Sequence, residues 1–369
     1  MVRLTSEMAR SAQVIPKKVS TKPVAFDPQP IARGFWHGPP LGPYQLLCLR
    51  SFASRGICVE VFSYDSEFAV PEWVISRDAR EIFPTERVLE YQVGFGRGSP
   101  SLHANLFRYI MLHQLGGWWI DLDVILMRPT LPESEFFFAR FGDSTTRLNT
   151  AVLKFPSKHP LMAEAIARSE TIGEHASEWA QTGPLLFTEL VERHELANLS
   201  QPYDSVHPIP WFEVDALFNP DRCNEMRERC AASTFLHLFN EVWRGSGIPR
   251  ELGPPVGSFI DQLFAEHDIG IGFKDRMTTD NVVRWIENRN RRIRLEGNER
   301  RLLVERSAME ARLEHLEKEQ ANLLASRAAM ETRLEGLLAS TSWKVTAPLR
   351  ALKRVLPGSR RSSSLPGID

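Results

Sequence analysis

The chain has 369 residues, of which 43% are hydrophobic and 25% are charged, and its formal net charge at pH 7 is −1. This balance is that of an ordinary soluble protein with a sizeable core, and it gives no electrostatic reason to expect nucleic acid as a partner. The four cysteines form no CxxC pair, which excludes a disulfide scaffold and agrees with a reducing cytoplasm.

Residues 1–30 are polar, contain prolines and show no hydrophobic period, so we predict a flexible extension. The segment lacks the apolar core of a signal peptide, and no stretch of the sequence has the roughly 20 consecutive apolar residues that span a bilayer. We therefore expect a cytoplasmic protein, either free or peripheral to the inner membrane.

Short apolar strands alternate with helical stretches across residues 31–275, which predicts an α/β domain whose sheet lies between helices. Strands are expected at 32–36, 58–65, 118–120, 136–141 and 149–155, and near 207–214 and 233–238. Helices are expected at 43–54, 99–117, 158–171 and 184–195. The glycines of GFGRGSP (94–100) lack the last glycine of a dinucleotide-binding motif, so they predict a turn and give little support to a nicotinamide enzyme.

Two aspartates interrupt a strongly apolar stretch, GGWWIDLDVILMRP at 116–129. Removing a carboxylate from water costs several kcal/mol unless a partner compensates it. In an extended segment Asp121 and Asp123 would share one face, several ångströms apart. The sequence leaves three compensations open: two basic side chains, a divalent cation, or an acid/base pair in which one carboxyl raises the pKa of the other.

The helix before this strand adds an amide and a guanidinium. Asn105 and Arg108 are three residues apart and therefore neighbours on the helix surface. The helix leads through two glycines into the aspartate strand, so these groups are expected to converge at a strand end, where open α/β sheets bind ligands. A cation shared by two carboxylates and a diphosphate would fit this set, which indicates a nucleotide diphosphate.

The segment ANLFRYIMLHQLGGWWIDLDVILMRP resembles the DXD region of retaining nucleotide-sugar glycosyltransferases with the GT-A fold, a group that includes α-1,4-galactosyltransferases and yeast outer-chain mannosyltransferases. The resemblance implies a GT-A fold, a bound Mn²⁺ or Mg²⁺, and a nucleotide-sugar donor. It further implies that Asn105 and Arg108 hold the uridine, that Asp121 contacts the ribose and donor sugar, and that Asp123 binds the metal.

Further short matches extend the resemblance from Phe35 to Trp243. FWHG and VFSYDS are similar to the family's first two strand ends, which places Trp36, Tyr64 and Asp65 at the nucleotide base. LNTAVLKFPSKHP and QTGPLLFTEL are similar to segments on the acceptor side, and FLHLFNEVWR to a late segment that reaches the metal or diphosphate and closes over the donor. The residues implied in these last three segments are Asn149, Thr182 and Gly183 for the acceptor, His237 for the metal, and Trp243 for the donor.

The pattern changes at residues 276–340, where leucine or methionine recurs every seven residues from Leu295 to Leu337. SAMEARLEHL (307–316) and AAMETRLEGL (328–337) are near-copies three heptads apart, which predicts a coiled coil that joins copies of the chain. The second core series is only one-third apolar, so a solvated single helix is the alternative.

Residues 341–369 carry six basic side chains against Asp369 alone. Such a segment with one tryptophan either contacts an anionic membrane surface or forms a solvated basic tail.

Together these observations predict a metal-dependent glycosyltransferase that moves a sugar, from a UDP-linked donor and with retention, to a saccharide or lipid-linked glycan of the bacterial surface. Asp121, Asp123 and Arg108 are the expected catalytic group. Two alternatives are a glycosyltransferase that modifies proteins and a coiled-coil interaction protein with an inactive transferase domain.

Overall fold

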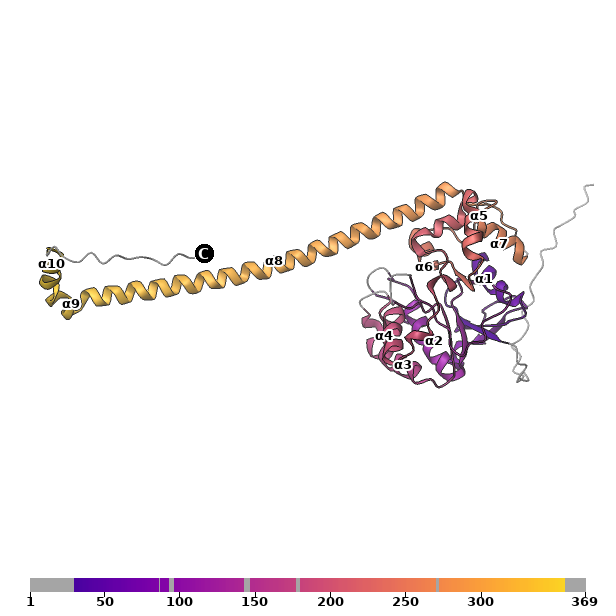
Figure 1. Cartoon of the computed structure of the whole chain (residues 1–369), viewed down its shortest axis with the longest axis horizontal. Helices are drawn as coiled ribbons and strands as arrows, with labels where there is room; N and C mark the ends of the chain where they lie inside the picture. Colours follow the sequence, from indigo (N-terminus) through magenta and orange to yellow (C-terminus); the bar gives the residue numbers. More distant parts are fainter. Residues whose placement is uncertain are drawn as a thin grey trace, which may run out of the picture. The chain divides into compact units, whose positions relative to one another are not determined.

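The computed structural model describes residues 30–355 except 86, 93–95, 143–146, 177–179 and 270–271. The chain divides into two units, Met1–Ile293 and Arg294–Asp369, which we describe separately (Figure 1). The predicted extension at 1–30 falls almost wholly outside the described residues, as do residues 94–95 of the glycine-containing turn and the tail from residue 356.

A five-stranded sheet forms the centre of the first unit, in the spatial order β3-β2-β1-β4-β6. The strands are β1 (Ile31–Phe35), β2 (Cys58–Ser63), β3 (Ile75–Asp78), β4 (Gly117–Ile120) and β6 (Val152–Phe155). Neighbouring strands are parallel except β6, which is antiparallel to β4. A second, two-stranded sheet pairs β5 (Val124–Leu126) with β7 (Phe235–His237) in antiparallel orientation. Helices lie between β1 and β2 and between β3 and β4 in the chain order, so the predicted α/β class is confirmed.

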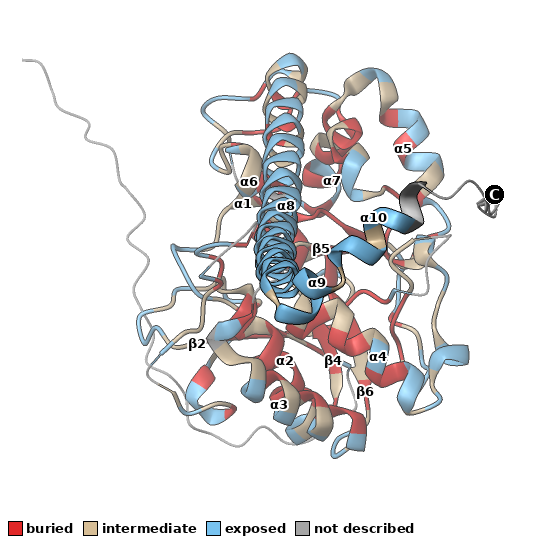
Figure 2. Ribbon diagram, turned by 90° about the vertical axis from the view of Figure 1, so that its left-hand side faces the viewer, coloured by how far each residue is buried: buried red, intermediate tan, exposed pale blue. Residues whose placement is uncertain are grey.

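The two tryptophans of β4 pack on opposite faces of the sheet. Trp119 packs against α2 (Ser101–Leu115), in an apolar cluster that also includes α3 (Pro160–Ile172) and α4 (Leu186–Arg193). Trp118 packs on the other face, in the cluster that includes α1 (Pro43–Ala53). Because successive strand residues alternate between faces, a strand covered on both sides is a continuous apolar run. The buried strands between helices are visible in Figure 2.

A third apolar cluster lies around β5 and β7. It contains side chains from α5 (Cys223–Cys230), α6 (Asn240–Ser246) and α7 (Phe259–His267). Val282 and Ile286, from the first turns of α8 (Thr279–Ala339), are buried in the same cluster. The first unit therefore includes the beginning of α8 as well as the α/β region.

Two predicted strands are wrong. Residues 211–218 form a 3₁₀ helix, η6 (Trp211–Phe218), which starts after Pro210 in a stretch where two prolines remove backbone donors. Residues 136–141 form only isolated bridges, such as Phe137 with Lys154, and Phe137 and Phe138 are buried without a continuous ladder. The sequence also missed β3, α5, α6 and α7, whose short apolar patterns are weak.

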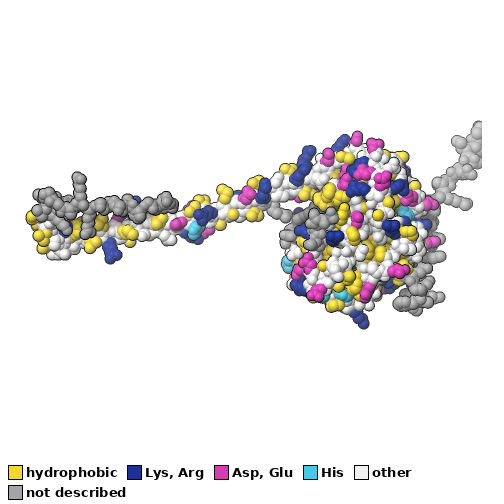
Figure 3. Space-filling model, in the orientation of Figure 1, with side chains coloured by type: hydrophobic (Ala, Val, Ile, Leu, Met, Phe, Trp, Pro, Cys, Tyr) yellow, Lys and Arg dark blue, Asp and Glu magenta, His cyan; other side chains and the backbone are white. Residues whose placement is uncertain are grey.

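From Arg294 onward, α8 is an exposed helix, which confirms the predicted long C-terminal helical extension. The heptad leucines and methionines are between 44% exposed (Leu316) and 72% exposed (Met309). Figure 3 shows these hydrophobic side chains on the surface along the helix. Pairing of this face with another helix remains a prediction. In the part of the chain that the structure describes, no helix is long and apolar enough to cross a membrane.

Candidate functional site

Helix α2 passes into β4 within two residues, and this tight junction fixes where the aspartates lie. Gly116 and Gly117 both have positive φ, of 65° and 82°. A Cβ atom on Gly116 would lie 2.5 Å from the backbone nitrogen of Ser157, so only glycine fits there. The strand that follows ends at Ile120, and Asp121 is the next residue.

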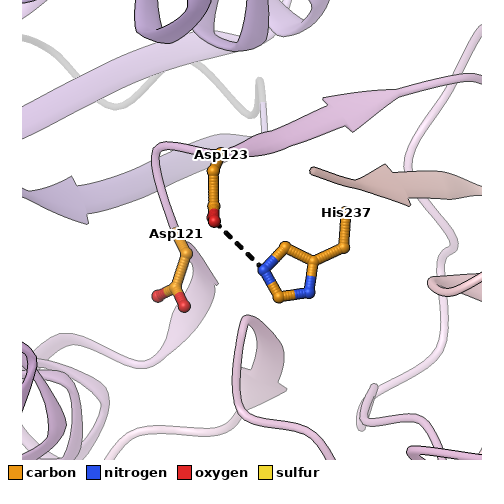
Figure 4. A group of neighbouring side chains, drawn as sticks. All are labelled: Asp121, Asp123 and His237. Atoms are coloured by element: carbon orange, nitrogen blue, oxygen red, sulfur yellow. Dashed lines mark hydrogen bonds and ion pairs between the residues drawn. The ribbon is translucent and has the colours of Figure 1, made fainter. Parts of the chain in front are cut away.

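The segment from Asp121 to Asp123 is a turn between β4 and β5, so the expected extended geometry is wrong. The amide of Val124 donates to the carbonyl of Asp121 at 3.2 Å, which closes the turn. The carboxylate of Asp123 points toward the imidazole of His237 on β7, and the carboxylate of Asp121 lies beside this pair (Figure 4). One potential ligand atom from each of these three residues lies within 4.8 Å of the other two.

Asp121 is held by two donors from the same neighbourhood. Its Oδ1 accepts hydrogen bonds from Nη2 of Arg108 and from Nε1 of Trp119, each at 2.7 Å. Burial is the largest influence on the pKa of Asp121 and raises it, Arg108 opposes this effect, and the charge of Asp123 adds to it. The net pKa is raised, so a further positive charge near this carboxyl would favour its ionised form.

Asp123 is held from the opposite side. Its Oδ2 lies 3.2 Å from Nε2 of His237 and accepts a hydrogen bond from the backbone amide of Asn240 at 2.8 Å. Burial raises the pKa of Asp123, but His237 and the hydrogen bonds outweigh it, and the pKa is lowered. The surroundings therefore raise the pKa of Asp121 and lower the pKa of Asp123.

Arg108 links the aspartates to the helix and to the loop before α4. Its Nη1 donates to Oδ1 of Asn105 at 2.8 Å, and Nδ2 of Asn105 donates to Oγ1 of Thr182 at 3.2 Å. The guanidinium carbon lies 4.9 Å from the centre of the Trp119 ring. A Cβ atom on Gly183 would lie 2.9 Å from Asn105, so glycine allows the loop to approach the amide. The expected acceptor residues Thr182 and Gly183 thus directly adjoin the expected uridine residues.

The residues expected at the nucleotide base lie at the ends of β1 and β2. Trp36 is partly buried, and its Nε1 donates to the carbonyl of Pro39 at 2.7 Å. Tyr64 donates to the carbonyl of Phe83 at 2.8 Å, and burial raises its pKa. Asp65 is exposed and accepts from the amide of Glu67. Because β1 pairs with both β2 and β4, these residues follow the same strand ends as Asp121.

Asn149 and Trp243 are both buried. Oδ1 of Asn149 accepts from the amide of Ala151, whose carbonyl in turn accepts from the amide of Asp121 at 2.7 Å. Trp243 is 1% exposed and packs edge-on against Tyr44 at 4.7 Å between ring centres. Its indole lines a cavity of about 10 Å³ beside Asp123, and its Nε1 is buried without a hydrogen-bond partner. In this structure the expected closing tryptophan is a core residue next to the aspartates.

Three contributors to the site were not predicted. The indole of Trp119 and the amide of Asn240 each hold one aspartate, as described above. Burial lowers the pKa of Arg250, after α6, and the charges of Glu241, Arg244 and, least of the three, Asp123 act on it. The role of Trp119 could have been predicted, because it stands two residues before Asp121 in the sequence. No feature of the neighbouring sequence indicated that Asn240 or Arg250 would lie near the aspartates.

The donor set fits a divalent cation. Two carboxylates and an imidazole offer the oxygen and nitrogen atoms that Mn²⁺ accepts, and carboxylate oxygens alone suit Mg²⁺. Nδ1 of His237 is buried without a hydrogen-bond partner among the described residues, so the ring is oriented by Asp123 at Nε2 and by packing against Phe239 at 4.2 Å between ring centres. The site therefore has the ligand types that a metal centre needs and brings their ligand atoms close together, and the lowered pKa of Asp123 favours its ionised form.

Residues 154–263 match a family model described as the alpha 1,4-glycosyltransferase conserved region. The matched segment includes Thr182, Gly183, His237 and Trp243, and it begins after the two aspartates. This match supports a glycosyltransferase as the class of enzyme.

Comparison with curated proteins found no match. Among 22 matching chains of solved structures is one titled PaToxG Glycosyltransferase. It is 13% identical, covers 46% of this chain and 72% of its own chain, and superposes with a TM-score of 0.34. A likeness of this size does not define a fold or a reaction.

Proposed function

We propose that the first unit is a GT-A glycosyltransferase that transfers a sugar from a UDP-sugar to a saccharide hydroxyl, with retention at the anomeric carbon. The observation that carries this proposal is the convergence of Asp121, Asp123 and His237 at the end of β4, next to Arg108 (Figure 4). A phosphate-rich ligand needs positive charge, and a cation held by these ligands together with a buried guanidinium would supply it.

In this proposal Asp123, Asp121 and His237 hold Mn²⁺ or Mg²⁺. The bound cation would neutralise the negative charge that develops on the leaving diphosphate. Arg108 is already oriented by Asn105 and Asp121, so it can bind the nucleotide without first losing side-chain freedom. Asp121 contacts the ribose and donor sugar through Oδ2, since Oδ1 accepts from Arg108 and Trp119.

The remaining assignments follow the positions of the strand ends. Trp36, Tyr64 and Asp65 bind the base, and Trp243 closes the donor site from the side of α6. Asn149, Thr182 and Gly183 border the acceptor. Closure by Trp243 would require its indole to leave the contact with Tyr44, which would also free the unpaired Nε1 to bind the donor.

The deciding experiment measures UDP release from a panel of UDP-sugars, with Mn²⁺ and with EDTA, for the wild type and Asp123→Ala. We expect metal-dependent turnover of one donor and a loss of at least about 100-fold in the variant, because a charge that stabilises the leaving group is removed. Asp204→Ala, at an exposed aspartate outside the site, is the matched control and should behave as wild type.

Calorimetric titration with Mn²⁺ separates binding from turnover. Loss of Mn²⁺ binding in Asp123→Ala but not in Asp204→Ala would support the metal site directly. Absence of Mn²⁺-dependent UDP binding in the wild type would return the aspartates to a structural role with Arg108.

The proposed acceptor is a saccharide or lipid-linked glycan of a bacterial surface polysaccharide, made at the cytoplasmic face of the inner membrane. A protein acceptor is the alternative, since it would use the same donor site. Incubation with a radiolabelled donor and cell extract distinguishes them, because a labelled protein band on a gel supports the protein acceptor and label in the organic-solvent extract supports the lipid-linked one. An interaction protein with an inactive domain would bind UDP and show no turnover with any acceptor.

We further propose that α8 pairs with a second copy of the chain through its heptad series. A stable soluble helix normally buries an apolar stripe, yet Leu302, Met309, Leu316 and Leu323 are all 44% or more exposed. Light scattering should give at least twice the 42.0 kDa chain mass. A double variant with aspartate at Leu316 and Leu323 should be monomeric, whereas Val304→Asp, on another helix face, should keep the wild-type mass.

A further inference from the structure

The last two helices of the chain form a short amphipathic segment with an unusual charge. Helix α8 ends at Ala339 because Ser340 has extended backbone, with ψ of 144°, and its hydroxyl caps α9 (Thr341–Val345) by accepting from the amide of Trp343. Helix α10 (Ala347–Val355) follows after one residue, with Pro348 in its first turn, where no backbone donor is lost.

Exposed apolar side chains of this segment form its apolar face. Val345 is the last residue of α9, and Leu349 and Leu352, three residues apart on α10, lie on the same side of that helix. They are 72%, 69% and 62% exposed. No described residue covers them, so in water this face stays exposed to solvent.

The charged side chains of this segment are all basic. From residue 336 to 368 the sequence has no aspartate or glutamate, and it has six lysines and arginines: Lys344, Arg350, Lys353, Arg354, Arg360 and Arg361. The heptad region before it differs, because acidic residues there alternate with basic ones and form pairs such as Arg327 with Glu331 at 2.9 Å. The change from mixed to purely positive charge coincides with the end of α8.

Arg350 shows how this segment is organised internally. Its guanidinium lies 3.6 Å from the centre of the Trp343 ring, and Nη1 donates to Oγ1 of Thr346 at 2.6 Å. The tryptophan is 43% exposed. A half-exposed indole beside a cation, next to an apolar face, is the arrangement that binds at the boundary between lipid headgroups and acyl chains.

We infer that α9 and α10 bind the surface of an anionic lipid bilayer. The apolar face enters the headgroup region, and Lys344 and Arg350 contact lipid phosphates. A nucleic acid would satisfy the charge but leave Val345, Leu349 and Leu352 in water, and a purely apolar partner would leave the charge unused. This inference goes beyond the proposed sugar transfer and does not depend on the donor chemistry.

The test is co-sedimentation of the full chain with vesicles of phosphatidylcholine alone and of phosphatidylcholine with 30 mol% phosphatidylglycerol. We expect at least about 10-fold stronger binding to the anionic vesicles, weakened by 0.5 M NaCl, because each basic residue near an anionic surface adds attraction that salt screens. A double variant with glutamine at Leu349 and Leu352, which removes apolar surface without changing the charge, should lose at least about 10-fold of that binding. Val256→Gln, at a side chain 70% exposed in the first unit, is the matched control and should bind as wild type.

Equal binding of the double variant and the wild type would overturn the inference, because charge alone would then account for it. Wild-type chain that remains in the supernatant with both vesicles would also overturn it, and would assign the segment to a protein partner. Since vesicle binding is measured without donor or metal, failure of sugar transfer does not affect the result. Circular dichroism should show unchanged thermal unfolding of the first unit in both variants.

Discussion

Arginine–carboxylate pairs occur in both units, but burial gives them different energetic weight. Arg108 lies 2.7 Å from Asp121, and its side chain is 4% exposed. Arg327 lies 2.9 Å from Glu331 on α8, and the two side chains are 75% and 60% exposed. A buried charge without its partner is costly, whereas an exposed pair is solvated whether or not it forms. At similar distances, the Arg108–Asp121 pair therefore constrains the structure, whereas the Arg327–Glu331 pair is a solvated surface contact.

The apolar side chains differ in the same way. Leucines of the α/β region, such as Leu106 and Leu112 on α2, are almost fully buried, whereas those of the heptad series are exposed. Helix α2 is stabilised by the sheet that it covers, but from Arg294 onward α8 has only its intrinsic propensity and its i, i+4 pairs within one chain. The first unit buries its apolar side chains within the chain, whereas the second exposes the apolar side chains for which we propose a partner helix and a membrane.

The difference between buried and exposed ion pairs is tested most strongly by replacing Arg108. Arg108→Met should lower the free energy of unfolding by about 3 kcal/mol, because Asp121 and Asn105 each lose a charged donor in a largely buried site. Urea denaturation measures the change. Arg168→Met, which removes an exposed pair with Glu189, is the matched control and should cost less than about 1 kcal/mol. Equal losses would contradict the distinction between the two kinds of pair.

Acid should destabilise the first unit while leaving α8 helical. His103 is buried, and burial lowers its pKa to about 4 from an ordinary value of 6.5. The unfolded chain therefore takes up a proton first as the pH falls, so this stabilising contribution is present above pH 6.5 and is lost between pH 6.5 and 4. The full effect is about 3 kcal/mol.

Unfolding free energies between pH 7 and 4 measure this dependence. His103→Gln should reduce the slope without abolishing it, because burial also lowers the pKa of His267 to about 4. A slope unchanged in His103→Gln would show that this histidine is not the group responsible.

A methyl group should have opposite effects at two glycines. Gly183→Ala forces the Asn105 amide to move, because the new Cβ atom would lie 2.9 Å from it, and we expect a loss of about 1 kcal/mol and weaker UDP binding. Gly297→Ala, inside α8, meets no atom within 4 Å and should instead stabilise that helix by about 0.5 kcal/mol. Thermal unfolding followed at 222 nm and UDP titration distinguish the two outcomes. Tolerance of Gly183→Ala would mean that the loop does not constrain Asn105.

The smallest effect is expected at an exposed pair of α8. Lys318→Ala, which removes the i, i+4 pair with Glu314 away from both core series, should change the helix stability by no more than about 0.5 kcal/mol, since such a pair in water contributes only that much. Circular dichroism at low and high salt measures the change. A larger loss would indicate that Lys318 lies within an interface between chains, where its removal breaks more than one contact.

Several elements were predictable because their signal lies within a short window. The apolar spacing of Leu102, Leu106 and Tyr109 and the two glycines that follow predict α2 and its end, and the heptad series predicts the length of α8. The elements that the sequence missed, such as α5 and α6, are short and have few apolar residues, so burial in the third cluster stabilises them more than local preference does. The strand predicted near 207–214 failed because two prolines prevent a ladder there, although the residues are apolar.

The sequence by itself determined the α/β alternation, the position of the two aspartates after β4 and the seven-residue period of α8, since each is a property of neighbouring residues. The tertiary structure alone decided that Asp121 and Asp123 are separated by a turn, and that β5 and β7 pair so that His237 and Asn240 reach Asp123 across more than 110 residues. It also decided that Trp243 is buried against Tyr44. The physical reason is that periodicity records which side of an element is apolar, whereas the partner of a buried charge is set by strand pairing between distant segments.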